Sequence, residues 1–168
     1  MPRIFACLAL SEFIVLLLTG TVGVWRLDPH ADRHVLLAVL AILLSCMIQV
    51  AAFTYLTVVE KATAQAVHLG RLALDPILSL KRLKKRFTRY LGLVLAAMLL
   101  ATATGASAWR GSPPDGWHFV AAMAVIALHV CAYLRQYGIL RDAGRIAAGV
   151  LVRYSAARAC GTRWSTPP

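Results

Sequence analysis

The chain has 168 residues, of which 60% are apolar, and its formal net charge is +11. Its mean hydropathy of +0.69 excludes an ordinary soluble domain of this length and indicates a membrane protein. The positive charge does not indicate nucleic-acid binding, because the cations lie at the ends of apolar segments and no binding motif accompanies them.

The first apolar segment covers residues 4–25, which is enough to cross a hydrocarbon core of about 30 Å. Arg3 precedes it, as a basic residue precedes the apolar core of a secretory signal. However, Glu12 interrupts the apolar run, and no Ala-x-Ala cleavage site follows. We therefore expect this segment to be retained as a membrane-spanning helix.

The first connection, RLDPHADRH, carries two histidines, His30 and His34. Together with His118, which we expect at the same membrane face, they are weak candidates for ligands of a divalent transition metal. A solvated polar loop accounts for the same residues, so we assign no metal site.

The second apolar segment covers residues 35–59. No glycine or proline interrupts the chain over residues 35–69, so we expect this helix to continue past the membrane. Gly70 weakens the pattern, and Asp75 with Pro76 provides a good N-cap and a good first residue for the next helix.

The connection of residues 60–89 leads into the third apolar segment, residues 90–108. Leu80, Leu83 and Phe87 recur at intervals of three and four, which predicts a helix with one apolar face and cations on the rest. The cations form a basic surface that we expect to attract anionic lipid headgroups, each charge contributing about 1 kcal/mol, or an acidic partner. This basic surface consists of Lys81, Arg82, Lys84, Lys85, Arg86 and Arg89.

Small residues repeat every fourth position in the third segment, at Ala97, Ala101 and Gly105. Such a stripe allows close approach of another helix, either from this chain or from a second copy. The fourth apolar segment covers residues 117–137, and its pattern continues into the tail of residues 138–168. We expect that helix, too, to extend beyond the membrane.

The distribution of cations predicts the topology. Fifteen of the 18 Lys and Arg residues lie before the first segment, in the 60–89 connection, or from the inner end of the fourth segment onward. The exceptions are Arg26, Arg33 and Arg110. The positive-inside rule then places both termini and the 60–89 connection in the cytoplasm. We predict a multi-pass protein of the inner (plasma) membrane of a bacterial-type cell.

These patterns predict an all-α, polytopic membrane protein, a bundle of four transmembrane helices with cytoplasmic helical extensions, in a single domain of residues 1–168. The sequence holds no Walker loop, GxSxG, HExxH or CxxC motif, so we do not expect an enzyme. The cysteines Cys7, Cys46, Cys131 and Cys160 lie within spans or in the tail, which favours packing over disulfide formation.

Three spans place a strongly polar side chain about eight residues from the predicted inner boundary, namely Glu12, Gln49 and His129. Ser45 lies one turn from Gln49, and Met98 has the same depth in the third span. A strongly polar group at this depth costs several kcal/mol unless it finds a partner. We expect an inward-facing polar cluster in which His129 donates to Glu12 and Gln49 hydrogen-bonds to either.

Interhelical hydrogen bonding that fixes helix register accounts for such a cluster. Three uses of an ionisable intramembrane site are the alternatives. The cluster would hold a quinone headgroup, bind haem b through His129 with Met98 opposite, or pass protons or a cation. Haem has the least support, because membrane b-type haems usually have two histidines on facing helices.

The leading functional hypothesis is a non-catalytic accessory or scaffold subunit of a larger membrane complex. Its partners would be other membrane subunits or further copies of itself, with anionic lipid at the basic surface. The alternatives are a redox-associated subunit that binds quinone or haem, and a small oligomeric transporter or channel.

Overall fold

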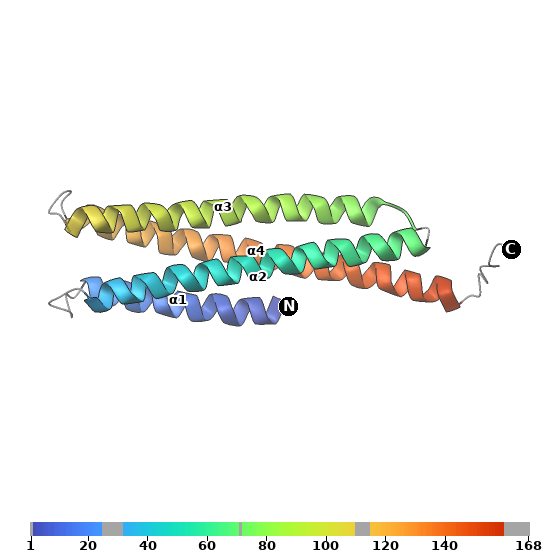
Figure 1. Ribbon diagram of the computed structural model, residues 1–168, viewed down its shortest axis with the longest axis horizontal. Coiled ribbons are helices and arrows are strands. Elements are labelled where there is room, and N and C mark those ends of the chain that lie inside the picture. Colours follow the sequence, from blue (N-terminus) through green and yellow to red (C-terminus); the bar gives the residue numbers. More distant parts are fainter. Residues whose placement is uncertain (1, 25–31, 71, 110–114, 160–168) are drawn as a thin grey trace.

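A computed structural model describes residues 2–24, 32–70, 72–109 and 115–159, and these form four α-helices (Figure 1). The helices are α1 (Pro2–Val24), α2 (Asp32–Gly70), α3 (Asp75–Trp109) and α4 (Asp115–Ala159). Each contains a stretch long and apolar enough to cross a membrane. The predicted all-α fold with four candidate spans is therefore confirmed.

Successive helices run in opposite directions along one long axis (Figure 1). The helices α2 and α4 form the centre of the bundle, because each packs against all three other helices. Among the described residues, no Cα atom of α1 lies within 8 Å of a Cα atom of α3. The helices α1 and α3 thus flank the α2–α4 pair on opposite sides.

The helices differ in length, and this divides the bundle into two parts. At 1.5 Å per residue, the 23 residues of α1 span about 35 Å and the 45 residues of α4 about 67 Å. The helices α2, α3 and α4 continue beyond the start of α1 (Figure 1). We call this continuation, residues 60–70, 75–89 and 138–159, the three-helix extension, and the rest the four-helix part.

Helix α2 ends and helix α3 begins at the residues that the sequence predicts. The amide of Leu72 donates to the carbonyl oxygen of Val67 over 3.0 Å, which closes the end of α2. Helix α3 begins at Asp75, directly before Pro76. Glycine does not interrupt α4, and at Gly144 it serves close packing, since a Cβ there would lie 3.3 Å from the Tyr55 hydroxyl oxygen.

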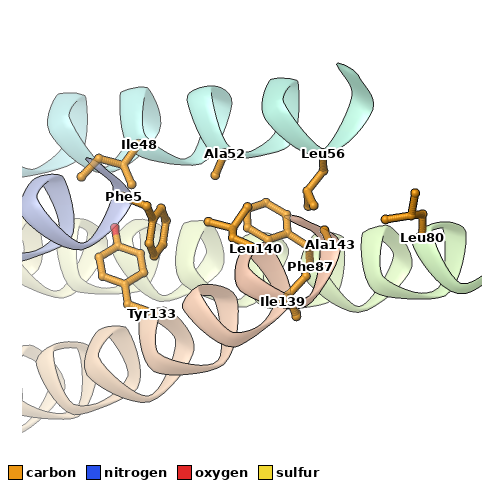
Figure 2. Packing of buried hydrophobic residues seen from close by; sticks show 10 residues of the cluster. All are labelled: Phe5, Ile48, Ala52, Leu56, Leu80, Phe87, Tyr133, Ile139, Leu140 and Ala143. Atoms are coloured by element: carbon orange, nitrogen blue, oxygen red, sulfur yellow. The ribbon is translucent and has the colours of Figure 1, made fainter. Parts of the chain in front are cut away.

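Apolar clusters fill the bundle from end to end. The largest cluster reaches from the amino-terminal part of α1 to the start of the extension. At its α1 end, the rings of Phe5 and Tyr133 pack edge to face with centroids 5.7 Å apart (Figure 2). The cluster consists of Phe5, Ile48, Ala52, Leu56, Leu80, Phe87, Tyr133, Ile139, Leu140 and Ala143. A second cluster consists of Leu16, Ala41, Ala97, Met98 and Val125, and a third, inside the extension, of Ala66, Val67 and Val150.

Large apolar side chains also face outward from the four-helix part. Leu36, Leu43, Leu99 and Leu134 are each more than 60% exposed. A soluble monomer rarely presents such a continuous apolar surface to water. The outward surface is therefore consistent with a multi-pass membrane protein.

Candidate functional site

The inner faces of three helices bring polar side chains together in the four-helix part. On α1, Phe5, Glu12 and Leu16 share one buried face, because they are separated by seven and four residues. On α4, the spacing of His129, Tyr133 and Gln136 also gives one face. Among the described residues, the buried polar or charged side chains are Glu12, Ser45, Gln49, Thr63, His129 and Gln136.

Tyr133 links α1 to α4 and α2. Its hydroxyl donates a hydrogen bond to Oε2 of Glu12, and the Ser45 Oγ lies 3.4 Å from the same hydroxyl. Its ring packs against Phe5 on one side and lies near the ring of His129, with centroids 5.7 Å apart. Tyr133 therefore holds the Glu12 carboxyl group in place by hydrogen bonding and by packing.

Glu12 and His129 face one another without completing a normal hydrogen bond. The Glu12 Oε1 and the His129 Nε2 are 3.7 Å apart, and neither atom has a hydrogen-bond partner. The other ring nitrogen of His129, Nδ1, lies 2.9 Å from the carbonyl oxygen of Val125. Because a carbonyl oxygen only accepts, we assign the hydrogen to Nδ1, which leaves Nε2 of the neutral ring as an acceptor.

This arrangement fixes the chemistry of the pair. Two acceptors that face each other in a buried site are unfavourable unless one of them carries a proton. Either Glu12 or the His129 ring can carry that proton. The carboxyl group has no exposed surface and His129 is 1% exposed, so bulk water does not reach the pair. The site can therefore hold one proton between two ionisable groups.

Gln49 takes a partner that differs from the expected one. Its amide donates to Gln136 over 3.2 Å, and the amide of Gln136 donates back over 2.9 Å. The two side chains thereby satisfy each other across α2 and α4. The structure pairs Gln49 with Gln136 instead of with Glu12 or His129, because α2 lies opposite a point on α4 seven residues, or about two turns, beyond His129.

Met98 lies in the apolar part of the interior. It is buried in the cluster that also contains Leu16, Ala41, Ala97 and Val125. The His129 nitrogen that an axial haem ligand would use faces Glu12 Oε1 at 3.7 Å. A porphyrin between His129 and Met98 does not fit this packing.

Tyr133 and Gln136 were not singled out as site residues in the sequence. In the sequence, Tyr133 is typical of an aromatic residue at the membrane interface, and Gln136 lies next to the predicted membrane boundary. Both lie on the helical face of His129, four and seven residues further along. That spacing was the available signal for including them.

The weak metal candidates lie apart from this cluster. The rings of His34 and His118 are close, with centroids 6.1 Å apart, whereas His30 lies outside the described residues. The Nδ1 of His34 is 3.1 Å from the Thr19 carbonyl oxygen. Within the described part of the chain, no three potential metal ligands from His, Cys, Asp and Glu come together.

His118 instead takes part in helix packing. A Cβ atom at Gly105 would lie 2.9 Å from the Cε1 of His118, so the His118 ring would have to move if another residue replaced this glycine. Ala97 and Ala101 of the same stripe pack in the second apolar cluster with Val125 of α4. The small-residue stripe therefore serves a contact within this chain.

The basic surface divides into one structural cation and five outward ones. The Lys84 Nζ lies 3.0 Å from the Glu60 Oε2 and 5.2 Å from the ring centroid of Phe53, which joins α3 to α2. The outward side chains are Lys81, Arg82, Lys85, Arg86 and Arg89.

Comparison with known proteins gives no relative from which a function can be transferred. No family model, no curated protein and no solved structure matches the chain.

Proposed function

We propose that this protein is a non-catalytic accessory or scaffold subunit of a larger membrane complex. The four-helix part spans a bacterial-type inner membrane, and the three-helix extension projects into the cytoplasm with both chain termini on that side. The observation that carries the proposal is the extension itself, a packed three-helix unit that continues from the bundle past the start of α1 (Figure 1).

The membrane placement is supported by two features of the helices. All four contain a candidate span, and their outward side chains in the four-helix part are large and apolar. The cations gather at the extension, as the positive-inside rule expects for a cytoplasmic segment.

The extension has the properties of a docking element. Ala66, Val67 and Val150 give it a core of its own, and the Lys84–Glu60 ion pair ties α3 to α2 at its base. A preformed surface of this kind avoids part of the ordering cost of association. Leu69 of α2 and Val152 of α4 are 65% and 67% exposed there, and the extension also carries most of the cations, so it offers both apolar and basic groups to a partner.

The interior of the four-helix part also favours a structural role. The Gln49–Gln136 amide pair and the Tyr133 hydrogen bond to Glu12 are made between helices of this chain. Interhelical hydrogen bonds of this type fix helix register in membrane bundles. Most of the buried polar atoms are thus engaged in holding the bundle together.

The test is purification of the tagged protein from its native membranes in mild detergent, followed by intact-mass analysis of what remains bound. We expect a stoichiometric protein partner that is lost from the Leu69→Gln/Val152→Gln variant. The Glu12→Gln variant, altered only in the interior, is the control and should retain the partner. A wild-type chain that emerges alone would overturn the accessory-subunit proposal.

A second candidate function, proton transfer within the membrane, is favoured by one specific observation. Glu12 Oε1 and His129 Nε2 lie 3.7 Å apart in the bundle interior without other partners. Such a pair can take up and release a proton, alone or together with a bound quinone. Proton flux into proteoliposomes that Glu12→Gln abolishes would support this function, and equal flux with both proteins would contradict it.

A further inference from the structure

We propose that four residues of α3, Arg86, Arg89, Tyr90 and Leu93, form a binding site for one anionic phospholipid. This inference rests on the membrane placement proposed above, and it names a ligand and a location that the accessory role does not require. The four side chains line an open pocket of about 420 Å³ on the surface of α3.

The two arginines supply the chemistry for a phosphodiester. Arg86 and Arg89 are exposed and lie three residues apart, on the same face of the helix. Neither guanidinium group forms an ion pair with another described residue. Guanidinium groups bind phosphate oxygens through two parallel hydrogen bonds, which makes a phosphate the favoured counter-ion of such a pair.

The order of residues along α3 matches the order of groups in a phospholipid. The arginines come first, the half-buried Tyr90 follows, and Leu93, which is 46% exposed, lies within the apolar segment of residues 90–108. A phosphate at the arginines would place the glycerol region beside Tyr90, where an aromatic ring with a hydroxyl group suits the membrane interface.

The same face of α3 then continues as an apolar track. Leu93, Ala96, Leu100 and Ala103 are all exposed and recur at intervals of three and four residues. The track covers about 15 Å along the helix axis. Gly92 lies beside it, and a Cβ atom there would meet nothing within 4 Å. An acyl chain can lie along this track while its headgroup stays at the arginines.

Other cations of the extension are less suited to this task. Lys84 is engaged with Glu60 at 3.0 Å, and its ammonium group also contacts the Phe53 ring. On α4, Arg141 and Arg145 lie 3.9 Å and 3.8 Å from the carboxylate of Asp142, which partly neutralises them. Arg86 and Arg89 therefore combine exposure, absence of a carboxylate partner and an adjoining apolar track.

The experiment measures lipid adducts of the full chain in detergent by native mass spectrometry, with phosphatidylglycerol and phosphatidylcholine supplied in turn. We expect one tightly held phosphatidylglycerol and no equivalent phosphatidylcholine. The Arg86→Gln/Arg89→Gln variant should bind phosphatidylglycerol about tenfold or more weakly. Arg141→Gln/Arg145→Gln, which removes the same net charge elsewhere on the extension, should bind as the wild-type protein does.

A further variant separates recognition from net charge. Arg86→Lys/Arg89→Lys keeps both charges but removes the planar guanidinium groups, and we expect binding between those of the wild type and the glutamine variant. If both glutamine variants lose phosphatidylglycerol binding to the same extent, general electrostatic attraction explains the binding and the proposed site is wrong. Displacement of the lipid by soluble glycerol phosphate would overturn it in favour of a free-phosphate site.

These outcomes are independent of the accessory-subunit proposal. The lipid experiment uses the purified chain, so loss of a protein partner does not affect it. Conversely, the absence of a protein partner in native membranes would overturn the proposed function and leave the lipid result standing. Recovery of the chain in the soluble fraction would overturn the membrane placement on which both depend.

Discussion

The four-helix part and the three-helix extension both have largely apolar interiors, but they differ in the side chains that they expose and in how many polar groups they bury. In the four-helix part, Glu12 and His129 are buried, and leucines such as Leu99 face outward. In the extension, Phe87 is fully buried, and arginines such as Arg86 face outward.

Helix α3 belongs to both parts, and its inward face stays apolar from Phe87 to Val94. Its outward face, in contrast, changes from arginines such as Arg89 to leucines such as Leu93 within about one turn. Such a change of the outward face is expected where a helix passes from water into lipid.

The comparison implies that a hydrogen bond or ion pair contributes a different amount to the free energy of unfolding in each of the two parts. A polar pair in the four-helix part has no water to replace a missing partner, whereas a pair on the extension does. Removing one partner should therefore cost more in the interior than on the extension.

The largest effect is expected at Glu12. The Glu12→Leu change removes the acceptor of the Tyr133 hydroxyl, which keeps only Ser45 Oγ at 3.4 Å, and places an apolar side chain against the buried His129 Nε2, so it should lower the free energy of unfolding by about 1–3 kcal/mol. Glu12→Gln should cost much less, because its amide can donate to His129 while its oxygen accepts from Tyr133. Reversible unfolding in mixed detergent measures both. Equal losses would contradict the proton-sharing geometry.

An intermediate effect is expected at the amide pair. Gln49→Leu alone leaves Gln136 unsatisfied and should lower the free energy of unfolding by about 1–2 kcal/mol. The double change Gln49→Leu/Gln136→Leu removes both partners and should restore most of that loss. A double-mutant cycle gives the coupling directly. Strictly additive losses would show that the two amides are not paired.

The smallest effect is expected at the ion pair of the extension. Lys84 and Glu60 are 27% and 19% exposed, so Lys84→Met or Glu60→Gln should lower the free energy of unfolding by only about 0.2–1 kcal/mol. High salt should reduce the difference between wild type and variants. A loss larger than that of Glu12→Leu would reverse the comparison between the two parts.

The sequence was sufficient to predict the helices and the proximity of His129 to Glu12. Continuous apolar patterns gave the four candidate spans, and the lack of breaks over residues 35–69 gave the long α2. His129 lies beside Glu12 as expected, at 3.7 Å, but the expected donation from its ring to Glu12 is not formed, because the ring hydrogen is assigned to Nδ1, which faces the Val125 carbonyl oxygen. The helices and this proximity depend on local composition and on depth, which the sequence encodes directly.

The partners of Gln49 and Glu12 could not be derived in the same way. The inner boundary of α4 was placed at Tyr137, but α4 continues as an unbroken helix to Ala159, so no local signal marks that depth. The axial offset between α2 and α4 is set by packing, such as the contact of Phe5 with Tyr133. Such contacts between distant residues set the register, and a single sequence does not display them.

The separation of Glu12 from Tyr133 along the chain, 121 residues, has a consequence for synthesis in the cell. At about 5–20 residues per second, the ribosome makes Tyr133 about 6–24 s after Glu12. On the proposed membrane placement, α1 enters the bilayer first, and its carboxyl group waits for α4 before it is satisfied. During that interval Glu12 would have to be shielded by a membrane chaperone or remain protonated. The order of biogenesis thus makes the first helix dependent on the last.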